Sequence, residues 1–216
     1  MQVHHLSVQK TARFATLNEL TDQTRHIWFV CHGYGQLAPY FIQKFAVLPP
    51  ESHFVVAPEA LSRFYMDGFS GKVGATWMTR EDREQEIGDY LAYLNQLYKH
   101  VISSLGTKRP DLQITLLGFS QGAATVSRWA FDGQVHFDRL ILWGGNIAHD
   151  LDFSQSGRIL AEKALFLIYG RQDPLIPTGV FEEQVEKISQ LSAQTKVIAF
   201  EGGHEIPAEV LQQYFG

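Results

Sequence analysis

Cysteine is nearly absent from the sequence, since Cys31 is the only one among 216 residues. One thiol forms no intramolecular disulfide and supplies no cysteine cluster for zinc. The nine histidines are scattered along the chain, and the adjacent His4 and His5 would point to opposite faces of a strand rather than toward one ion. We therefore expect neither a disulfide framework nor a metal site, and we expect Cys31 to fill part of the core.

An excess of positive charge and long apolar runs are also missing. The net charge is -5 and the pI is about 6.0, so no basic field attracts nucleic acid or anionic lipid. No apolar run approaches the roughly 18 residues that span a bilayer, and the opening MQVHHLSVQKTARF has no apolar segment typical of a signal peptide. We expect a cytoplasmic protein with no nucleic-acid partner and no stable membrane association.

Hydrophobic residues make up 45% of the chain, which is enough for one sizeable core. The sequence contains no internal repeat, low-complexity tract or linker-like stretch. We expect one domain that spans residues 1–216. The sequence leaves the oligomeric state open.

Six apolar or β-branched runs end in turn residues, at 27–33, 53–58, 114–119, 140–145, 165–170 and 197–203. Their near-continuous apolarity predicts strands that are buried on both faces, as in a parallel sheet. Between these runs, apolar residues recur at helical spacing, most clearly at 81–105. Thr79 and Asp82 predict a capping box at the start of that helix. Looser alternation in the first twenty residues predicts short antiparallel strands at the sheet edge. The pattern predicts an α/β fold with a mostly parallel central sheet and helices on both faces.

A serine lies between two glycines in GFSQG, residues 118–122, directly after one predicted strand and before a helical stretch. That context is the one in which Ser120 is held as a nucleophile on a sharp strand-to-helix turn. Glycines beside it avoid clashes in such a conformation, and the helix N-terminus favours negative charge. By itself the pattern is common, so an ordinary serine at a glycine-rich corner is the alternative.

A nucleophilic serine needs a histidine base and an acid that orients it. Asp173 follows the strand 165–170 and His204 follows the strand 197–203, in the chain order Ser, Asp, His. All three lie at carboxyl ends of strands, where open α/β sheets place their chemistry. Asp150 and Asp152 are alternative acids, and His149 is an alternative base. His149 precedes all of these acids in the chain, which is not the order Ser, Asp, His, so we interpret it as a loop residue.

The turn HGYGQ, residues 32–36, follows the first predicted strand. Its Tyr34 backbone NH, together with that of Gln121, is the predicted pair of donors for the negative charge that develops in acyl transfer. The alternative is a glycine turn that only links a strand to a helix.

A long connection at 57–78 carries aromatic residues and glycines, and we interpret it as a wall of the substrate site. Phe64, Phe69 and Trp77 are its candidate substrate-binding residues, while Arg63 and Lys72 are candidates to meet an anionic substrate. The alternative is a surface loop that its aromatics pin to the core.

Together HGYG, GFSQGAA, GRQDPLIP and GGHEIP resemble the phospholipase/carboxylesterase branch of the α/β-hydrolases, which includes acyl-protein thioesterases, over residues 27–215. That branch typically has Gly-Phe-Ser-Gln-Gly around its serine and Asp-x-x-[Val/Ile]-Pro around its acid, here DPLIP. The resemblance implies an α/β-hydrolase fold and the following roles: Ser120 as nucleophile, Asp173 as acid, His204 as base, and the NH groups of Tyr34 and Gln121 as oxyanion donors. The connection 145–163 is too short for a large cap domain.

Two departures from the family pattern lie near the substrate side. The usual HG-x-G-D turn ends in Gln36, and the usual Trp-Phe-Asp appears as TWMTRED. Both leave the substrate undetermined.

The predicted function is a serine hydrolase, carboxylesterase- or lysophospholipase-like, that cleaves a small-molecule carboxylic ester or thioester through an acyl-enzyme on Ser120. The resemblance implies no metal or cofactor. Two alternatives stay open: a non-catalytic ligand-binding protein of the same fold, and a peptidase with the same triad. The sequence does not fix the acyl chain, the leaving group, or ester against thioester.

Overall fold

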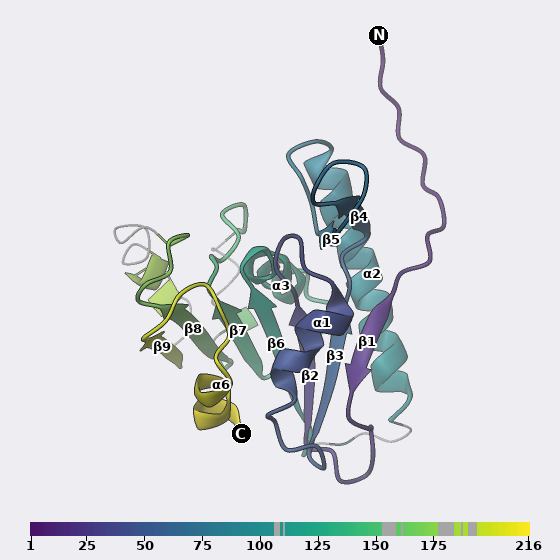
Figure 1. Ribbon diagram of the computed structural model, residues 1–216. Helices are drawn as coiled ribbons and strands as arrows, with labels where there is room; N and C mark the ends of the chain where they lie inside the picture. Colours follow the sequence, from purple (N-terminus) through teal and green to yellow (C-terminus); the bar gives the residue numbers. More distant parts are fainter. Residues whose placement is uncertain are drawn as a thin grey trace.

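A seven-stranded sheet forms the centre of the computed structural model (Figure 1). The structure describes residues 1–105, 109, 111–152, 159–160, 162–176, 184–186, 188–189 and 194–216. The strand order is β1-β3-β2-β6-β7-β8-β9. The bounds are β1 Phe14–Leu17, β2 His26–Cys31, β3 His53–Pro58, β6 Gln113–Phe119, β7 Arg139–Trp143, β8 Ala164–Gly170 and β9 Thr195–Phe200.

Six neighbouring strands of this sheet, β3, β2, β6, β7, β8 and β9, pair in parallel. Each of the six apolar runs becomes one of these strands. The prediction of a mostly parallel sheet is confirmed. The antiparallel edge is confirmed as well, because β1 pairs antiparallel with β3. It holds one strand rather than two, since residues 1–13 form no strand and extend away from the sheet in Figure 1.

Helices cover both faces of the sheet (Figure 1). Alternate residues of β2 point to opposite sides: Ile27, Phe29 and Cys31 belong to one apolar cluster, and Trp28 and Val30 to another. The first cluster packs under two helices, α2 Arg83–Ser103 and α3 Gln121–Phe131. The second packs under α1 Ala38–Phe41, the 3-10 turn η1 Ile42–Phe45 and α6 Ala208–Phe215.

Two of the core expectations have clear outcomes. Cys31 is fully buried, as expected, and burial raises the pKa of its thiol. The prediction of a capping box at the start of α2 is wrong, because Asp82 has φ 46° and its side chain makes no cap hydrogen bond. The Thr79 NH instead donates to the Glu86 carboxylate in the first turn of α2.

The connection at 57–78 contains a second, two-stranded sheet that the sequence pattern did not predict. Strands β4 Ser62–Tyr65 and β5 Val73–Thr76 pair antiparallel. They stand above the carboxyl ends of the parallel strands in Figure 1. The segment is a hairpin rather than an irregular loop, and it borders the edge of the sheet where the candidate site lies.

The segment that joins β7 to β8, residues 144–163, has twenty residues, which is too few for a large cap domain. Among the residues that the structure describes, no helix combines the length and the apolarity needed to cross a bilayer.

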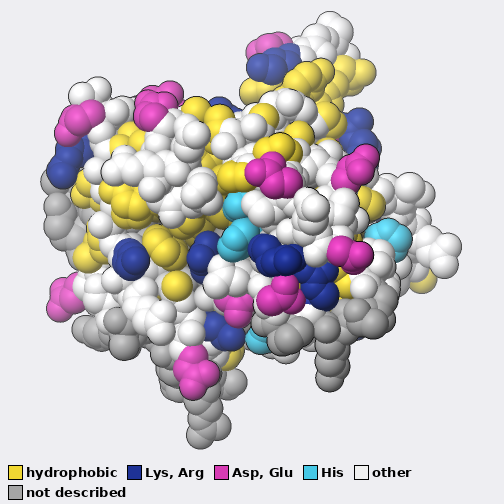
Figure 2. Space-filling view, turned by 90° about the horizontal axis from the view of Figure 1, so that it is seen from below, with side chains coloured by type: hydrophobic (Ala, Val, Ile, Leu, Met, Phe, Trp, Pro, Cys, Tyr) yellow, Lys and Arg dark blue, Asp and Glu magenta, His cyan; other side chains and the backbone are white. Residues whose placement is uncertain are grey.

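Two histidines are stacked at the opposite end of the sheet, where β2 and β3 begin. His26 and His53 are register partners, and their ring centroids lie 4.5 Å apart. Burial, the neighbouring His53 and Arg139 together lower the pKa of His26 to about 4. Figure 2, which views the molecule from this end, shows histidine side chains among Lys and Arg side chains near the middle of the face.

This arrangement predicts a loss of stability in mild acid. An unfolded histidine takes up a proton near pH 6.5, whereas folded His26 stays neutral down to about pH 4. The free energy of unfolding therefore falls as the pH drops from about 6.5 to about 4. His26→Phe keeps the stacked ring and removes the titration, so its stability falls less over this range in urea unfolding. The exposed His4→Phe is the control, and an equal pH slope in wild type and His26→Phe would contradict the prediction.

Candidate active site

Ser120 lies at the junction of β6 and α3 with φ 56° and ψ -118°. A non-glycine residue rarely has this backbone conformation, which costs energy that the surrounding structure must balance. A Cβ added to Gly118 would lie 2.1 Å from the Gly122 oxygen, and one added to Gly122 would lie 2.2 Å from the Cys31 oxygen. The strained turn predicted from GFSQG is present, and both flanking glycines are required by close backbone contacts.

Asp173 and His204 meet at the same edge of the sheet, beyond β8 and β9. The Asp173 Oδ2 and His204 Nδ1 atoms are 2.7 Å apart, and the Asp173 side chain is fully buried while that of His204 is 20% exposed. The other carboxylate oxygen accepts a hydrogen bond from the Leu175 NH at 2.9 Å. The buried carboxylate thus orients the imidazole and leaves Nε2 to face other groups.

Glycines at the end of β7 lie between His204 and Ser120. A Cβ at Gly144, where φ is +56°, would lie 3.3 Å from the His204 ring, and one at Gly145 would lie 2.3 Å from the Ser120 oxygen. The Phe119 ring is 4.7 Å from the His204 ring, centroid to centroid. Among the described residues, no hydrogen bond joins the Ser120 hydroxyl to His204; bonds of this kind often tighten only when substrate is bound.

The alternative acids lie elsewhere. Asp150 accepts hydrogen bonds from Arg128, at 2.9 Å from Nη2, and from Arg83 at 2.8 Å. Burial would raise the pKa of Asp150, but these two guanidinium groups lower it to about 2. Asp152 and His149 are exposed. The structure therefore pairs Asp173 with His204, whereas Asp150 links α2 to α3.

The turn 32–36 lies against the serine. A Cβ at Gly33 would be 3.1 Å from the Ser120 Cβ. The Gln36 Oε1 accepts from the Gly33 NH at 2.8 Å, and the Gly35 NH donates to the Ala75 oxygen of β5 at 2.9 Å. Within the described part of the chain, the backbone NH groups of Tyr34 and Gln121 donate to no other group, so both are available as donors at the site.

The Gln121 side chain forms hydrogen bonds that connect the turn at Ser120 to the end of the hairpin. The sequence analysis did not predict this role. Its Oε1 accepts from the Trp77 NH at 3.2 Å, and its Nε2 donates to the Met78 oxygen at 2.9 Å and to the Thr76 hydroxyl at 3.0 Å. These partners lie more than forty residues away in the chain, and no local pattern signals such a contact.

His32 fixes the other side of the turn. Its Nδ1 lies 2.8 Å from the Gly33 oxygen, and its Nε2 accepts from the Ala60 NH at 3.1 Å. Burial lowers the pKa of His32, so the ring is held neutral with Nδ1 as the donor. The Trp77 indole NH donates to the His32 oxygen at 2.8 Å.

The aromatic residues assigned to the substrate wall differ in their placement. Trp77 is 2% exposed and packs between His32 and Tyr90, so direct contact with a substrate is excluded and Trp77 supports the wall from behind. Phe64 is half-buried, with its ring 5.1 Å from that of Tyr34, and Phe69 is fully exposed. Arg63 is bound to the buried Glu59 at 2.6 Å rather than being free for an anionic substrate.

Comparisons with known proteins show a family and a fold that this chain shares. A sequence profile described as phospholipase/carboxylesterase matches residues 15–215. Acyl-protein thioesterase 2 from Zea mays is 16% identical with a TM-score of 0.68, covering 95% of this chain and 100% of its own. A carboxylesterase from Mesorhizobium loti is 19% identical with a TM-score of 0.71, covering 94% and 93% respectively. A comparison with functionally curated proteins gives no match. At these identities the solved structures show a shared fold.

The ion pairs of Asp150 predict a structural role. Arg128 is 5% exposed, and its described side-chain partners are the Asp150 carboxylate and, at 3.2 Å, the Tyr90 hydroxyl. Asparagine at position 150 keeps one oxygen acceptor but leaves the buried guanidinium without a compensating charge. Asp150→Asn therefore lowers the free energy of unfolding by roughly 2–3 kcal/mol near neutral pH, measured by urea denaturation. Because folded Asp150 titrates near pH 2 and an unfolded aspartate near 4, the difference from wild type disappears as the pH falls from about 4 to about 2. Asp67→Asn, at an exposed hairpin position, is the control.

Proposed function

The chain belongs to the phospholipase/carboxylesterase family, and we propose that it is a serine hydrolase that cleaves carboxylic ester or thioester bonds through an acyl-enzyme on Ser120. The observation that carries this proposal is the 2.7 Å hydrogen bond between Asp173 and His204 at the sheet edge where Ser120 occupies its strained turn. Relatives of this fold bear the names acyl-protein thioesterase and carboxylesterase, which supports ester and thioester substrates.

The first half of the proposed reaction forms the acyl-enzyme. His204 accepts the hydroxyl proton as Ser120 Oγ bonds to the carbonyl carbon, and the carbonyl oxygen becomes an oxyanion. The Tyr34 and Gln121 NH groups and the N-terminus of α3 stabilise that charge. The intermediate collapses, the bond to the leaving oxygen or sulfur breaks, and the imidazolium gives its proton to the leaving group.

The second half returns the free enzyme. His204 accepts a proton from water as the water oxygen attacks the acyl carbon, and the bond to Ser120 Oγ breaks as Oγ regains the proton. The product is a carboxylic acid. The Asp173 carboxylate accepts hydrogen bonds from His204 and from the Leu175 NH, so it orients the imidazole and stabilises the imidazolium.

The two alternatives are separated by experiment. A non-catalytic ligand-binding protein has no need for serine, acid and base together, and this chain has all three in the required order. A peptidase shares the same machinery, so only a substrate panel distinguishes it from an esterase or thioesterase.

The nucleophile assignment predicts that Ser120→Ala lowers kcat for a short-chain p-nitrophenyl ester by roughly 10⁴-fold or more, because no oxygen remains to attack the carbonyl. Circular dichroism should show an unchanged fold. In wild type, a fluorophosphonate probe should label Ser120, as located by mass spectrometry. Undiminished turnover in Ser120→Ala, or no labelling of wild type, would overturn the assignment. Matched esters, thioesters and peptides then define the substrate class.

The acid assignment predicts that Asp173→Asn lowers kcat by roughly 10³–10⁴-fold, because an amide no longer fixes the imidazole tautomer or stabilises the imidazolium. The matched control is Asp150→Asn, assayed at a temperature where it is folded. It removes a carboxylate that is bound to Arg128 and Arg83 instead, and its kcat should equal that of wild type. The reverse ranking of the two variants would assign the acid role to Asp150.

A further inference from the structure

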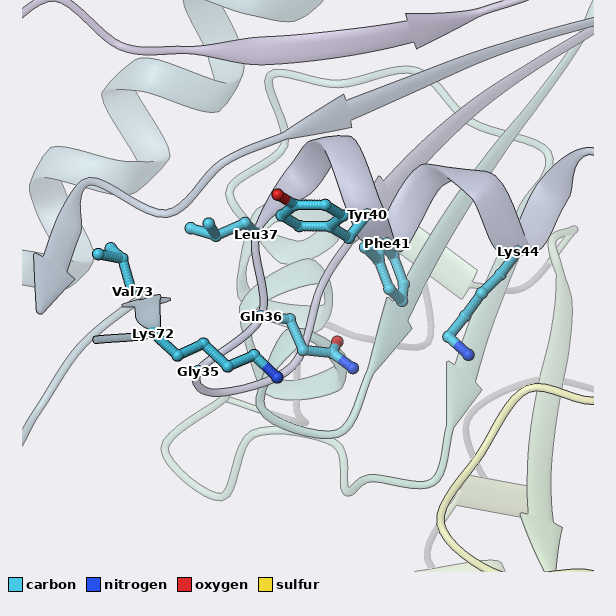
Figure 3. A pocket seen from close by; sticks show the side chains of 8 residues that line it. All are labelled: Gly35, Gln36, Leu37, Tyr40, Phe41, Lys44, Lys72 and Val73. Atoms are coloured by element: carbon cyan, nitrogen blue, oxygen red, sulfur yellow. The ribbon is translucent and has the colours of Figure 1, made fainter. Parts of the chain in front are cut away.

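A cavity of about 670 Å³ opens beside the turn that carries Tyr34 (Figure 3). Gln36 lines it from the turn, Tyr40, Phe41 and Lys44 line it from α1 and η1, and Lys72 lines it from the hairpin. We call it the lysine cavity. It lies outside the groups that perform the proposed bond cleavage, and those groups leave its two lysines without a role.

The lysine cavity is close to the nucleophile. Gln36 lines the cavity and accepts a hydrogen bond from the Gly33 NH at 2.8 Å, and a Cβ at Gly33 would touch Ser120 at 3.1 Å. From the other side, the ring of Phe41 lies 6.2 Å from that of Phe119, the residue before the nucleophile. A substrate whose carbonyl is at Ser120 can therefore place another part of itself in this cavity.

The charge of the lysine cavity is one-sided. Figure 3 shows the Gln36 side chain between those of Lys72 and Lys44. The described lining residues include no carboxylate, and within the described structure neither lysine lies within ion-pair distance of an acidic group. By contrast, Arg63 on the same hairpin is bound to Glu59. Two like charges that face one cavity repel each other, and an anion bound between them offsets that repulsion.

Gln36 keeps the lysine cavity free of negative charge. The turn presents a neutral amide to the cavity at this position, where an acidic side chain would cancel one of the two ammonium charges. Its Oε1 performs the structural task of binding the Gly33 NH, a task that a carboxylate oxygen would also perform. The amide therefore preserves the turn and leaves both ammonium charges uncompensated.

We propose that the lysine cavity binds an anionic group, a carboxylate or a phosphate, carried by the substrate; this inference rests on the proposed hydrolase function. Lys44 and Lys72 supply the charge, Gln36 supplies an amide donor, and the exposed Tyr40 ring forms an apolar wall. The substrate class is then an ester or thioester that bears a negative charge beyond the scissile bond, on its acyl side or on its leaving side.

The test compares charged and neutral esters of matched size. On the acyl side the pair is mono-p-nitrophenyl glutarate and p-nitrophenyl pentanoate. On the leaving side it is 4-carboxyphenyl acetate and 4-methylphenyl acetate. For each pair the ratio of kcat/KM, charged over neutral, is measured in wild type and in Lys44→Gln/Lys72→Gln. We expect one ratio to fall roughly five- to tenfold in the double variant, mainly through a higher KM for the charged ester.

Two further variants sharpen the result. Gln36→Asp adds a carboxylate to the cavity while both lysines remain, and it should lower the same ratio. Lys99→Gln removes an exposed positive charge from α2, outside the cavity, and should leave the ratio unchanged. The pair whose ratio falls identifies the side of the substrate that carries the anion. Equal ratios in wild type and in the Lys44→Gln/Lys72→Gln double variant for both pairs overturn the inference.

Failure of the proposed function is recognised separately. If wild type hydrolyses none of the esters, calorimetric titration with glutarate and, in a second experiment, with inorganic phosphate tests the cavity alone. Binding of either anion to wild type that is lost in the double variant supports the site and identifies its anion. The absence of binding by both anions overturns it.

Discussion

The backbone of Ser120, held at φ 56°, is the constraint on which the rest of the site depends. Such a turn fits only where the neighbouring segments of the backbone carry no side chains at the points of contact. Gly118 meets the Gly122 backbone, Gly122 meets the Cys31 backbone, Gly145 meets the Ser120 carbonyl, and Gly33 meets the Ser120 Cβ. These glycines come from the end of β6, the start of α3, the end of β7 and the turn after β2. A parallel sheet brings these segments together because its carboxyl ends share one edge.

A network of hydrogen bonds holds the strained turn in place. Gln121, the residue after the serine, is bound through its side chain to residues 76–78 of the hairpin. Trp77 in turn binds the His32 carbonyl, and His32 binds the backbone on both sides of it. The turn at Ser120, the hairpin and the turn 32–36 are thus one connected unit. Since buried polar networks are rigid when every member is bonded, this network fixes the positions of the Tyr34 and Gln121 NH groups, which donate to no group in the described part of the chain.

The sheet and the pairing of Asp173 with His204 were predictable from the sequence. The hairpin and the hydrogen bonds that connect it to the turns of the site were not. Long apolar runs reveal buried parallel strands, because burial on both faces leaves a continuous signal. The hairpin of β4 and β5 has short strands and a mixed composition, SRFY and VGAT, so no periodicity marks it. Trp77 looked like a substrate contact because an aromatic residue in a connection is ambiguous until its burial is known. The capping box failed because Asp82 adopts a left-handed conformation that spacing does not reveal.

Glu59 holds together the elements on either side of the lysine cavity. Its side chain is fully buried, and it binds Arg13 of the segment before β1 at 2.7 Å, Arg63 of β4 at 2.6 Å and the Ala38 NH at the start of α1 at 3.2 Å. Burial would raise the pKa of Glu59, but the two guanidinium groups lower it, so the carboxylate is charged and fixes α1 and the hairpin on either side of the lysine cavity. For the proposed hydrolase, with α1 and the hairpin held in place and no large cap above them, we expect discrimination between substrates to depend on the side chains that these elements present. Lys44 and Lys72 are the charged ones among those that line the cavity.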